Sequence, residues 1–242
     1  MTNLGDTVLA TENLSYCYGK LTVWEEVNLC VKSGEVIFLL GQNGAGKSTL
    51  LRCLAGRSCP ASGEITLCGE KFTGKNREQR SKISFVSDTP SFYDDLTAEE
   101  HLQFVLRANG RGDDYTQAEK LLDDFGLLRY VRQYPSSYSR GMREKLALVI
   151  AFMIKPRLLL FDEPYGPLDS DASQMLSSLI KSNISTGSSV ILSCHHSIPD
   201  LEPNKVLLLD EGALHTRDKS ILDEFWGKKQ TFSSDDWSTS EV

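Results

Sequence analysis

Consecutive apolar residues recur along this chain in short runs that are typical of buried strands. The first run occupies residues 36–40, and further runs lie at 157–162, 189–194 and 205–210. Helical stretches separate the later runs, and strands covered by helices on both faces are apolar throughout rather than alternating. We therefore predict a parallel sheet at the centre of an α/β fold.

The N-terminal part of the chain shows an alternation of apolar and polar residues, which indicates half-buried strands. We expect such strands at residues 13–18, 23–31, 35–40 and 63–69. Turn-forming pairs, Gly19-Lys20 and Ser33-Gly34, separate the first three. We predict an antiparallel sheet beside the strand that ends at Leu40.

Residues from about 90 to 156 have a helical character. Two segments, beginning at Thr97 and Thr116, match the capping box, in which a Thr and a later Glu satisfy each other's free backbone N–H groups. Gly126 and Pro135 stand where helices are expected to end. Because strand patterns resume afterwards, we predict a helical subdomain inserted into the α/β core.

The length of 242 residues allows one large α/β domain with subdomains, or at most two small domains. We predict one domain over residues 1–227, because the helical block interrupts a single α/β core. Residues 228–242 are polar, with Ser, Thr, Asp and Glu, and we expect this tail to be disordered.

Composition is that of an ordinary globular protein, with 40% hydrophobic and 24% charged residues. The 26 basic and 33 acidic residues give a net charge of −7 without a basic stripe, so we expect no nucleic-acid partner. Six cysteines lack C-x-x-C spacing, which favours free thiols in a reducing cytosol. No signal peptide is evident, and the longest apolar run (146–154) is shorter than the roughly 20 residues of a membrane span.

The candidate chemistry centres on a glycine-rich segment, GQNGAGKST, between the apolar run at 36–40 and a helical stretch at 49–55. Strand, glycine loop and helix in this order form a P-loop, whose backbone N–H groups and helix N-terminus cradle phosphate oxygens. Lys47 would reach the β- and γ-phosphates, and the Ser48 hydroxyl would bind Mg²⁺. The predicted nucleotide-binding residues are Gly41, Asn43, Gly44, Ala45, Gly46, Lys47, Ser48 and Thr49.

Two adjacent carboxylates, Asp162 and Glu163, follow an apolar run. At the C-terminal edge of a sheet, Asp162 would face the metal, usually through a water molecule. Glu163 would lie where a water attacking the γ-phosphate must be polarised or oriented. Together with a P-loop, this pair predicts nucleotide hydrolysis.

Ser139 precedes the helix predicted at 143–154, and Gly141 follows it closely. A serine at a helix start offers a hydroxyl, free N–H groups and the positive end of the helix dipole, which together favour an anion. With the P-loop and the paired acids, the segment YSRGM resembles the signature loop, usually LSGGQ, of the ATP-binding cassette (ABC) family of ATPases. The resemblance covers residues 8–215.

The form of this signature loop departs from the family pattern in part. Ser139 and Gly141 match it, whereas Tyr138, Arg140 and Met142 do not. The sequence YSRGM is similar to the signature loops of cassettes that serve drug, peptide or haem exporters. In this family the signature loop of one cassette binds the γ-phosphate held by a second cassette, so the resemblance implies a head-to-tail pair.

The resemblance assigns roles to further residues. His195 matches the switch histidine that contacts the γ-phosphate, and the neighbouring His196 stays open as a residue that shares this role. Tyr18 matches the aromatic residue that stacks on adenine, with Tyr16 as the alternative. Asp169 matches the loop that joins one cassette's site to that of its partner.

One departure concerns the metal. Where the family usually has a glutamine, this chain has Asp88, after the strand-like residues 83–86. A carboxylate oxygen is a good ligand for Mg²⁺, but Asp is shorter than Gln by one methylene and carries a charge. Whether Asp88 binds the metal directly or through water is left open.

The family resemblance implies the ABC ATPase fold, with a P-loop core, an N-terminal antiparallel β subdomain and an inserted helical subdomain. It implies ATP and Mg²⁺ as cofactors, and two ATP molecules sandwiched between two cassettes, in a homodimer or with a related chain. Membrane-spanning permease subunits would be further partners, so we expect a peripheral location at the cytoplasmic face of the cell membrane. The resemblance implies that the chain powers a transporter of the exporting kind, and its cargo is left open.

Other P-loop functions fit less well. A GTPase needs N-K-x-D, and Asn204-Lys205 lacks the acid. A small-molecule kinase needs neither Ser139 nor Glu163, because its nucleophile is a substrate hydroxyl. Within the ABC family, a soluble ATPase of the iron–sulfur assembly type has a similar size and stays the alternative.

Overall fold

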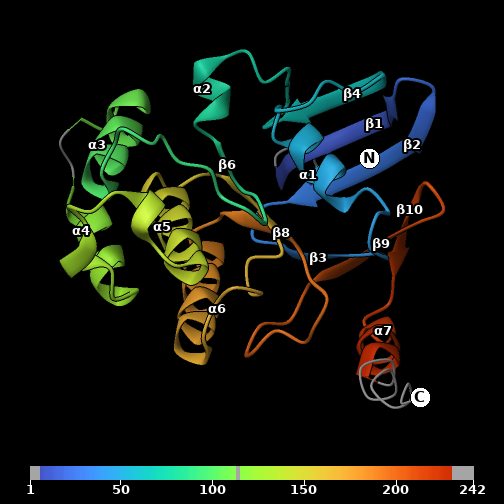
Figure 1. Cartoon of the computed structure of the whole chain (residues 1–242). Helices are drawn as coiled ribbons and strands as arrows, with labels where there is room; N and C mark the ends of the chain where they lie inside the picture. The colour runs from blue at the N-terminus through green and yellow to red at the C-terminus, as the bar shows by residue number, and fades with distance from the viewer. Residues whose placement is uncertain (1–5, 113–114, 231–242) are drawn as a thin grey trace, which may run out of the picture.

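A six-stranded sheet forms the centre of the molecule in the computed structural model, which describes residues 6–112 and 115–230 (Figure 1). Its order is β10-β9-β3-β8-β7-β6. The strands are β3 (Val36–Leu40), β6 (Ile83–Val86), β7 (Leu158–Asp162), β8 (Ser189–Ser193), β9 (Lys205–Asp210) and β10 (Ala213–Arg217). Neighbouring strands are parallel except β9 and β10. The predicted parallel sheet is confirmed, and its strands share one carboxyl edge.

A second, four-stranded antiparallel sheet has the order β2-β1-β4-β5. Its strands are β1 (Thr7–Tyr18), β2 (Leu21–Lys32), β4 (Ser62–Leu67) and β5 (Glu70–Lys71). The antiparallel sheet is confirmed, but β1 begins at Thr7 rather than at residue 13. Asn13 has φ 48°, and the pairing with β2 shifts between Thr11 and Leu14. This bulge interrupts the alternation and hides the first half of the strand from pattern analysis.

Alternate residues of β3 face two separate hydrophobic cores. Phe38 and Leu40 pack with the helices, whereas Ile37 and Leu39 pack with the antiparallel sheet and with α1 (Lys47–Leu54). All four side chains are fully buried. Burial on both faces explains why this strand is apolar throughout, and it holds the loop that follows β3 at the centre of the molecule.

Helices make up most of the segment between β6 and β7. The helices in this segment are α3 (Ala98–Ala108), α4 (Thr116–Asp124), η2 (Leu128–Tyr130), η3 (Pro135–Ser137) and α5 (Arg140–Met153). The helices elsewhere in the described chain include α2 (Arg77–Arg80), α6 (Ser170–Ser185) and α7 (Ile221–Gln230). In Figure 1, α3 and α4 lie at the opposite end of the molecule from the antiparallel sheet. The predicted helical insertion is confirmed.

Two of the predicted helix boundaries are wrong. Thr97 forms the expected capping box with Glu100. Thr116, however, is already inside α4, where Tyr115 is the N-cap residue without a side-chain hydrogen bond. Pro135 begins the short helix η3 instead of ending a helix, because proline suits the first helical turn as well as a helix stop. Gly126, with φ 68°, follows α4 as predicted.

The C-terminal helix α7 runs to Gln230, past the predicted tail boundary at residue 228. Leu222, Phe225 and Trp226 pack α7 against the helical core before that boundary. The remainder of the predicted tail, residues 231–242, lies outside the described residues. Among the described residues, none of the helices has the length and apolar character of a membrane span.

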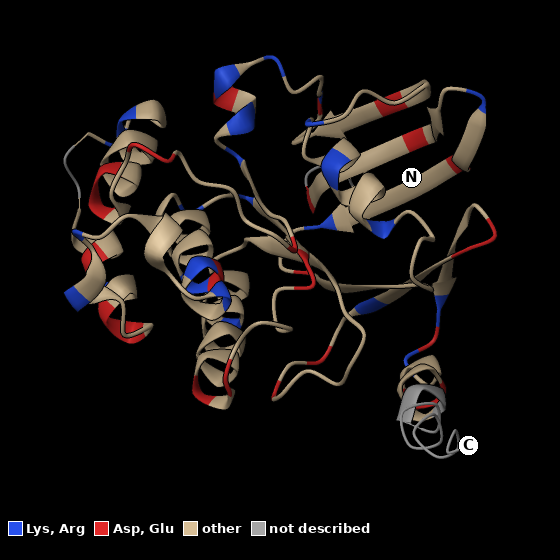
Figure 2. Ribbon diagram, in the orientation of Figure 1, with Lys and Arg blue, Asp and Glu red and all other residues tan. Residues whose placement is uncertain are grey.

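Charged residues are distributed over both sheets and the helices, and acidic residues also occupy loops near the middle of the molecule (Figure 2). Asp162 ends β7 and Glu163 follows it, while Asp88 lies after β6. The adjacent strands β6 and β7 are parallel, so these acids emerge at the same edge of the sheet. The carboxyl edge of a parallel sheet is where ligands bind in open α/β folds.

Candidate nucleotide site

The glycine-rich loop between β3 and α1 is closely packed. Gly46 precedes α1 with φ 100°, and a Cβ atom there would lie 2.6 Å from Val23 Cγ1. A Cβ atom on Gly41 would lie 2.5 Å from the backbone oxygen of Leu209. Glycine is therefore required at both positions, since the neighbouring strands leave no room for a side chain. The loop reaches its conformation only with the two sheets packed against it.

Lys47 is the first residue of α1, and its side chain is 5% exposed. Its Nζ atom donates hydrogen bonds to the backbone oxygens of Gly41 and Gln42, at 2.9 and 3.1 Å. The ammonium group thus lies within the turn of the loop. A phosphate bound to the loop would meet this charge directly.

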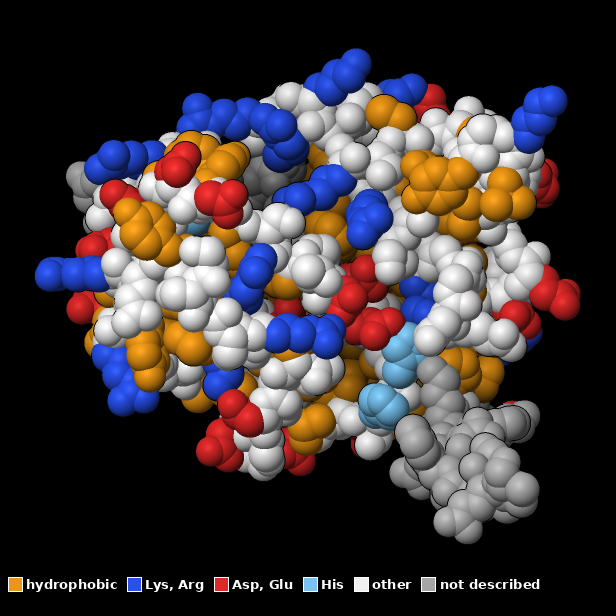
Figure 3. Space-filling model, in the orientation of Figure 1, with side chains coloured by type: hydrophobic (Ala, Val, Ile, Leu, Met, Phe, Trp, Pro, Cys, Tyr) orange, Lys and Arg blue, Asp and Glu red, His pale blue; other side chains and the backbone are white. Residues whose placement is uncertain are grey.

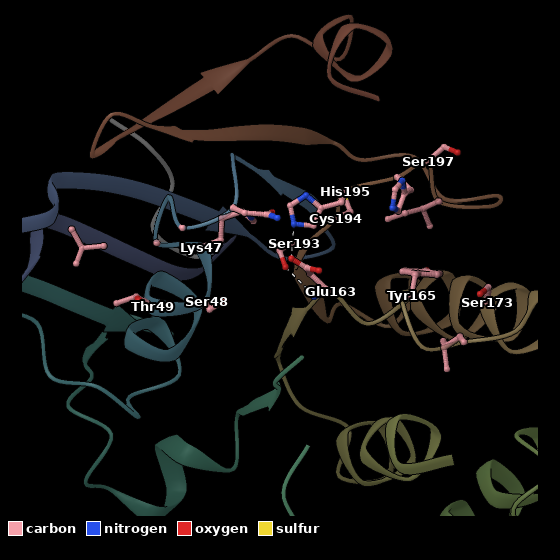
Figure 4. A pocket seen from close by; sticks show the side chains of 18 of the residues that line it. Lys47, Ser48, Thr49, Glu163, Tyr165, Ser173, Ser193, Cys194, His195 and Ser197 are labelled. Atoms are coloured by element: carbon pink, nitrogen blue, oxygen red, sulfur yellow. Dashed lines mark hydrogen bonds and ion pairs between the residues drawn. The ribbon is translucent and has the colours of Figure 1, made fainter. Parts of the chain in front are cut away.

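A cavity of about 1100 Å³ opens beside this loop (Figure 4). The residues that line it from the loop and α1 are Asn43, Gly44, Gly46, Lys47, Ser48 and Thr49. Tyr18 lines one side, and Glu163 and His195 line another. The cavity is large enough for a nucleoside triphosphate, and it brings together the P-loop, an aromatic ring and the two predicted catalytic residues.

Tyr18, rather than Tyr16, faces the cavity. Tyr18 is 55% exposed, and its hydroxyl lies 3.4 Å from the Thr49 hydroxyl. Tyr16 is half-buried and packs on the fully buried Trp24, with ring centroids 5.6 Å apart. An exposed ring above the helix start can stack on a base, whereas Tyr16 does not line the cavity.

Asp162, Glu163 and His195 meet where β7 and β8 end. Asp162 is 1% exposed and accepts a hydrogen bond of 2.9 Å from the Ser193 hydroxyl. The Oε1 atom of Glu163 lies 2.5 Å from His195 Nε2. His196 lines the same cavity but is exposed. In the space-filling view, histidine side chains lie beside acidic ones near the middle of the face (Figure 3).

The signature residues lie outside this cavity. Ser139 is exposed and caps α5, with its hydroxyl accepting a hydrogen bond of 3.2 Å from the Met142 N–H. Asp169 caps α6 and forms a 2.7 Å ion pair with Lys145 of α5. The hydrogen bond that Lys145 donates to the Asp169 carboxylate is the main cause of the lowered pKa of Asp169. A Cβ atom on Gly141 would lie 2.9 Å from the Pro167 oxygen, so the signature helix packs closely on the Asp169 loop.

Asp88 is not among the residues that line the cavity. Its Oδ1 atom accepts a hydrogen bond of 3.0 Å from Arg140, and both side chains are largely exposed. Two residues that depart from the family pattern are therefore paired with each other. The metal role of Asp88 stays a prediction.

Sequence reasoning missed two buried residues near the site. Ser193 is fully buried and bonded to Asp162. Glu144, on the first turns of α5, is 1% exposed, and neither carboxylate oxygen has a hydrogen-bond partner among the described residues. Burial above all raises the pKa of Glu144 to about 8. A carboxylate on the apolar face of a predicted helix is the signal that could have drawn attention to Glu144.

The residues present fit a magnesium–nucleotide complex. Mg²⁺ prefers oxygen ligands and is usually held by one or two protein groups together with substrate phosphates. Ser48 offers a hydroxyl from the P-loop, and Asp162 has a second carboxylate oxygen beyond the one bonded to Ser193. Among the described residues there is no cluster of three or more His, Cys, Asp and Glu that could hold a metal alone.

Comparison with known proteins identifies the family. Residues 24–166 match the family described as ABC transporter. The chain is 36% identical over 189 residues to the bacitracin transport ATP-binding protein BcrA of Enterococcus faecalis, covering 78% of this chain and 61% of BcrA. It is 30% identical over 191 residues to the ABC-type transporter ATP-binding protein EcsA of Bacillus subtilis, covering 78% of this chain and 77% of EcsA.

Solved structures agree with this assignment. A structure described as the ATP binding subunit of an ABC transporter matches with a TM-score of 0.81 at 29% identity, covering 96% of each chain. A bacterial Atm1-family ABC exporter with ATP bound matches with a TM-score of 0.81 at 18% identity, covering 97% of this chain and 43% of the exporter chain, which shows the fold alone. The chain therefore belongs to the ABC transporter family and has the fold of its ATP-binding subunits.

Proposed function

We propose that this chain hydrolyses ATP with Mg²⁺ and powers a membrane transporter. The observation that carries the proposal is the single cavity shared by Lys47, Glu163 and His195, because it places a phosphate cradle opposite a carboxylate that can orient water. Relatives named as transport ATP-binding proteins support the coupling to transport.

The geometry suggests a role for each group. Tyr18 would stack on the base, the P-loop and Lys47 would hold the phosphates, and Glu163 would orient the attacking water. The water oxygen bonds to the γ-phosphorus while the bond to the bridging oxygen breaks, so ADP leaves with that oxygen. His195, 2.5 Å from Glu163, would hold the carboxylate in place and face the γ-phosphate. Ser48 and Asp162 would hold Mg²⁺, which neutralises phosphate charge when bound.

A second cassette would complete the site. Ser139 and Gly141 lie outside the cavity of their own chain, and Ser139 is exposed at the N-terminus of α5. The positive end of a helix can bind phosphate. In a head-to-tail pair, each Ser139 loop would close on the triphosphate held by the P-loop of the other chain.

A groove on the helical side is the proposed contact with a membrane-spanning subunit. This cavity of about 800 Å³ is lined by Arg57, Arg77 and Arg80, and by aromatic residues including Tyr93 and Phe104. Tyr93 and Phe104 are 61% and 49% exposed. Two of these arginines, Arg77 and Arg80, belong to α2, whose basic residues are coloured in Figure 2. The groove fits a helix with an apolar face and an acidic side chain toward the arginines.

The loop after β6 would connect this groove to the nucleotide. Ser87 and Pro90 line the groove, Asp88 pairs with Arg140, and Arg143 donates a 3.0 Å hydrogen bond to the Pro90 oxygen. Movement of α5 on closing of an ATP dimer would thus reach the groove. By the form of the signature loop we propose export, with the chain at the cytoplasmic face of the membrane.

The catalytic proposal is tested by Glu163→Gln, with phosphate release and ATP binding measured separately. The rate of phosphate release should fall about 100-fold or more, because the amide cannot accept a proton from water or polarise it as the carboxylate does. ATP binding should be retained, since the phosphate cradle is intact. Lys47→Ala provides the contrast: it should weaken ATP binding itself. Unchanged turnover in Glu163→Gln would refute the assigned role of this carboxylate.

A further inference from the structure

Ser193 lies next to the candidate catalytic residues at the ends of β7 and β8. It is the last residue of β8, directly opposite Asp162 in the register with β7, and it is fully buried. His195 follows two residues later on the same segment. In Figure 4 the Ser193 side chain lies beside Glu163 and His195 at the end of the sheet.

The hydrogen bonds of Ser193 have a determined direction. The Glu163 backbone N–H donates to Ser193 Oγ at 2.9 Å, and Ser193 Oγ donates to Asp162 Oδ1 at 2.9 Å. A backbone N–H can only donate and an ionised carboxylate can only accept, so the hydroxyl is acceptor toward one and donor toward the other. One hydroxyl thus links the candidate metal ligand to the backbone of the candidate catalytic residue.

The backbone of Glu163 needs such a contact. Glu163 has φ 55°, in the left-handed region that non-glycine residues rarely adopt. A residue in this conformation costs free energy and persists where surrounding contacts hold it. The bond to Ser193 is one such contact, and the conformation it supports leaves the Glu163 carboxylate against His195.

We propose that Ser193 is a positioning residue for ATP hydrolysis. Its hydroxyl orients both the Asp162 carboxylate and the Glu163 side chain. This inference rests on the proposed ATPase function. Without the hydroxyl, Asp162 loses a donor and the Glu163 N–H loses its acceptor. Both carboxylates would then have more freedom, while the P-loop, whose shape is held by other contacts, would keep its conformation.

The test compares Ser193→Ala with Ser189→Ala in steady-state ATP hydrolysis at saturating Mg²⁺. Ser189 is a matched control, because it lies on the same strand, is fully buried, and donates a 2.7 Å hydrogen bond to the Lys32 oxygen. We expect Ser193→Ala to lower kcat about 10- to 100-fold with KM for ATP changed less than about threefold. Ser189→Ala should keep kcat within about twofold.

Rescue separates positioning from packing. Ser193→Thr keeps the hydroxyl and should restore most of kcat, and thermal melting verifies that each variant is folded. If the extra methyl group prevents folding, Ser193→Cys, which keeps a weaker donor and acceptor, should give an intermediate kcat. Equal kcat values in wild type and Ser193→Ala, or equal losses in the two alanine variants, would overturn the inference. An inactive wild type would instead contradict the proposed function.

Discussion

Three carboxylates near the ends of β6 and β7 have very different surroundings. Asp162 is buried and hydrogen-bonded to Ser193, and Asp88 is exposed and paired with Arg140. Glu144 is buried without a hydrogen-bond partner among the described residues. A buried carboxyl group of this kind is least costly when neutral, because burial penalises the charged form. Glu144 is therefore one residue through which pH acts on the stability of this fold.

We predict that Glu144→Gln stabilises the protein at high pH. Burial first, then the charge of Asp88, raises the pKa of Glu144 from 4.5 to about 8. The folded state thus holds a proton that the unfolded state releases, so wild-type stability falls as pH rises from about 4.5 to about 8. Thermal melting at pH 8.5 should show the Gln variant more stable by roughly 5 °C.

Melting the same two proteins at low pH is the control for this substitution. At pH 5 the carboxyl group of Glu144 is neutral, and the two proteins should melt within about 1 °C of each other. The exposed Glu119, replaced in the same way, should show no difference at either pH. A constant gap between wild type and Glu144→Gln from pH 5 to 8.5 would contradict the buried-carboxyl explanation.

At the scale of elements, the P-loop is shaped by packing from outside the loop. Val23 and Trp24 of β2 occupy the space that a side chain at Gly46 would need, and Leu209 of β9 occupies the corresponding space at Gly41. The antiparallel sheet and the edge of the parallel sheet therefore meet at the loop. Changes in β2 or β9 should therefore affect nucleotide binding, although the predicted phosphate ligands lie in the loop and at the start of α1.

We predict that Gly46→Ala reduces both ATP affinity and melting temperature. The methyl group would lie 2.6 Å from Val23 Cγ1 at φ 100°, so a clash adds to backbone strain. Gly69→Ala isolates the strain, because Gly69 has φ 82° with open space around its Cβ position. Thermal melting and ATP titration should show that Gly46→Ala loses about 1–3 kcal/mol more free energy of unfolding and of ATP binding than Gly69→Ala does. Equal losses would show that the neighbouring strands yield to the methyl group.

At the scale of the whole molecule, the P-loop cavity and the Ser139 loop are separate surfaces of one chain, as the proposed pair of cassettes requires. The cavity with the P-loop lies on one side of the parallel sheet's carboxyl edge, and Ser139 is exposed at the start of α5. The groove lined by Arg57, Arg77 and Arg80 is a third surface, separate from both. This arrangement fits a chain that works with a second cassette and with a membrane-spanning partner.

We predict that Glu163→Gln forms an ATP-dependent dimer, because slow hydrolysis leaves the triphosphate in place between two chains. Size-exclusion chromatography with light scattering should show the mass doubling upon addition of Mg-ATP. Adding Ser139→Phe should abolish the dimer by blocking the helix N-terminus, while Ser136→Phe, at another exposed serine nearby, should not. A monomer under all these conditions would contradict the shared site.

We predict that Arg80→Glu releases the chain from membranes. The charge reversal would oppose an acidic side chain of the docked helix. Fractionation of cells should find wild type with the membranes and Arg80→Glu in the supernatant, with thermal melting as the check of folding. Arg132→Glu, at an exposed site of the helical subdomain, is the matched control. Wild type recovered only with soluble proteins would favour the iron–sulfur assembly type of ATPase instead.

The sequence by itself determined the parallel sheet, the helical insertion and the P-loop, because each is encoded in a contiguous pattern. Apolar runs mark buried strands, and the phosphate cradle is formed by neighbouring residues whose spacing is visible in the chain. Local signals failed where one residue type suits two positions in a helix. Thr116 is predicted as an N-cap but lies inside α4, and Pro135 is predicted to end a helix but begins η3.

Only the tertiary structure decided the contacts between distant segments. The Ser193 hydroxyl meets Glu163 because β7 and β8 are neighbours in a particular register. Asp88 meets Arg140 across a separation of 52 residues, and no local pattern predicts that contact. The burial of Glu144 likewise depends on what packs against α5. Side chains that act on each other across strands are specified by the whole fold, since their distance is set by strand order and not by spacing in the chain.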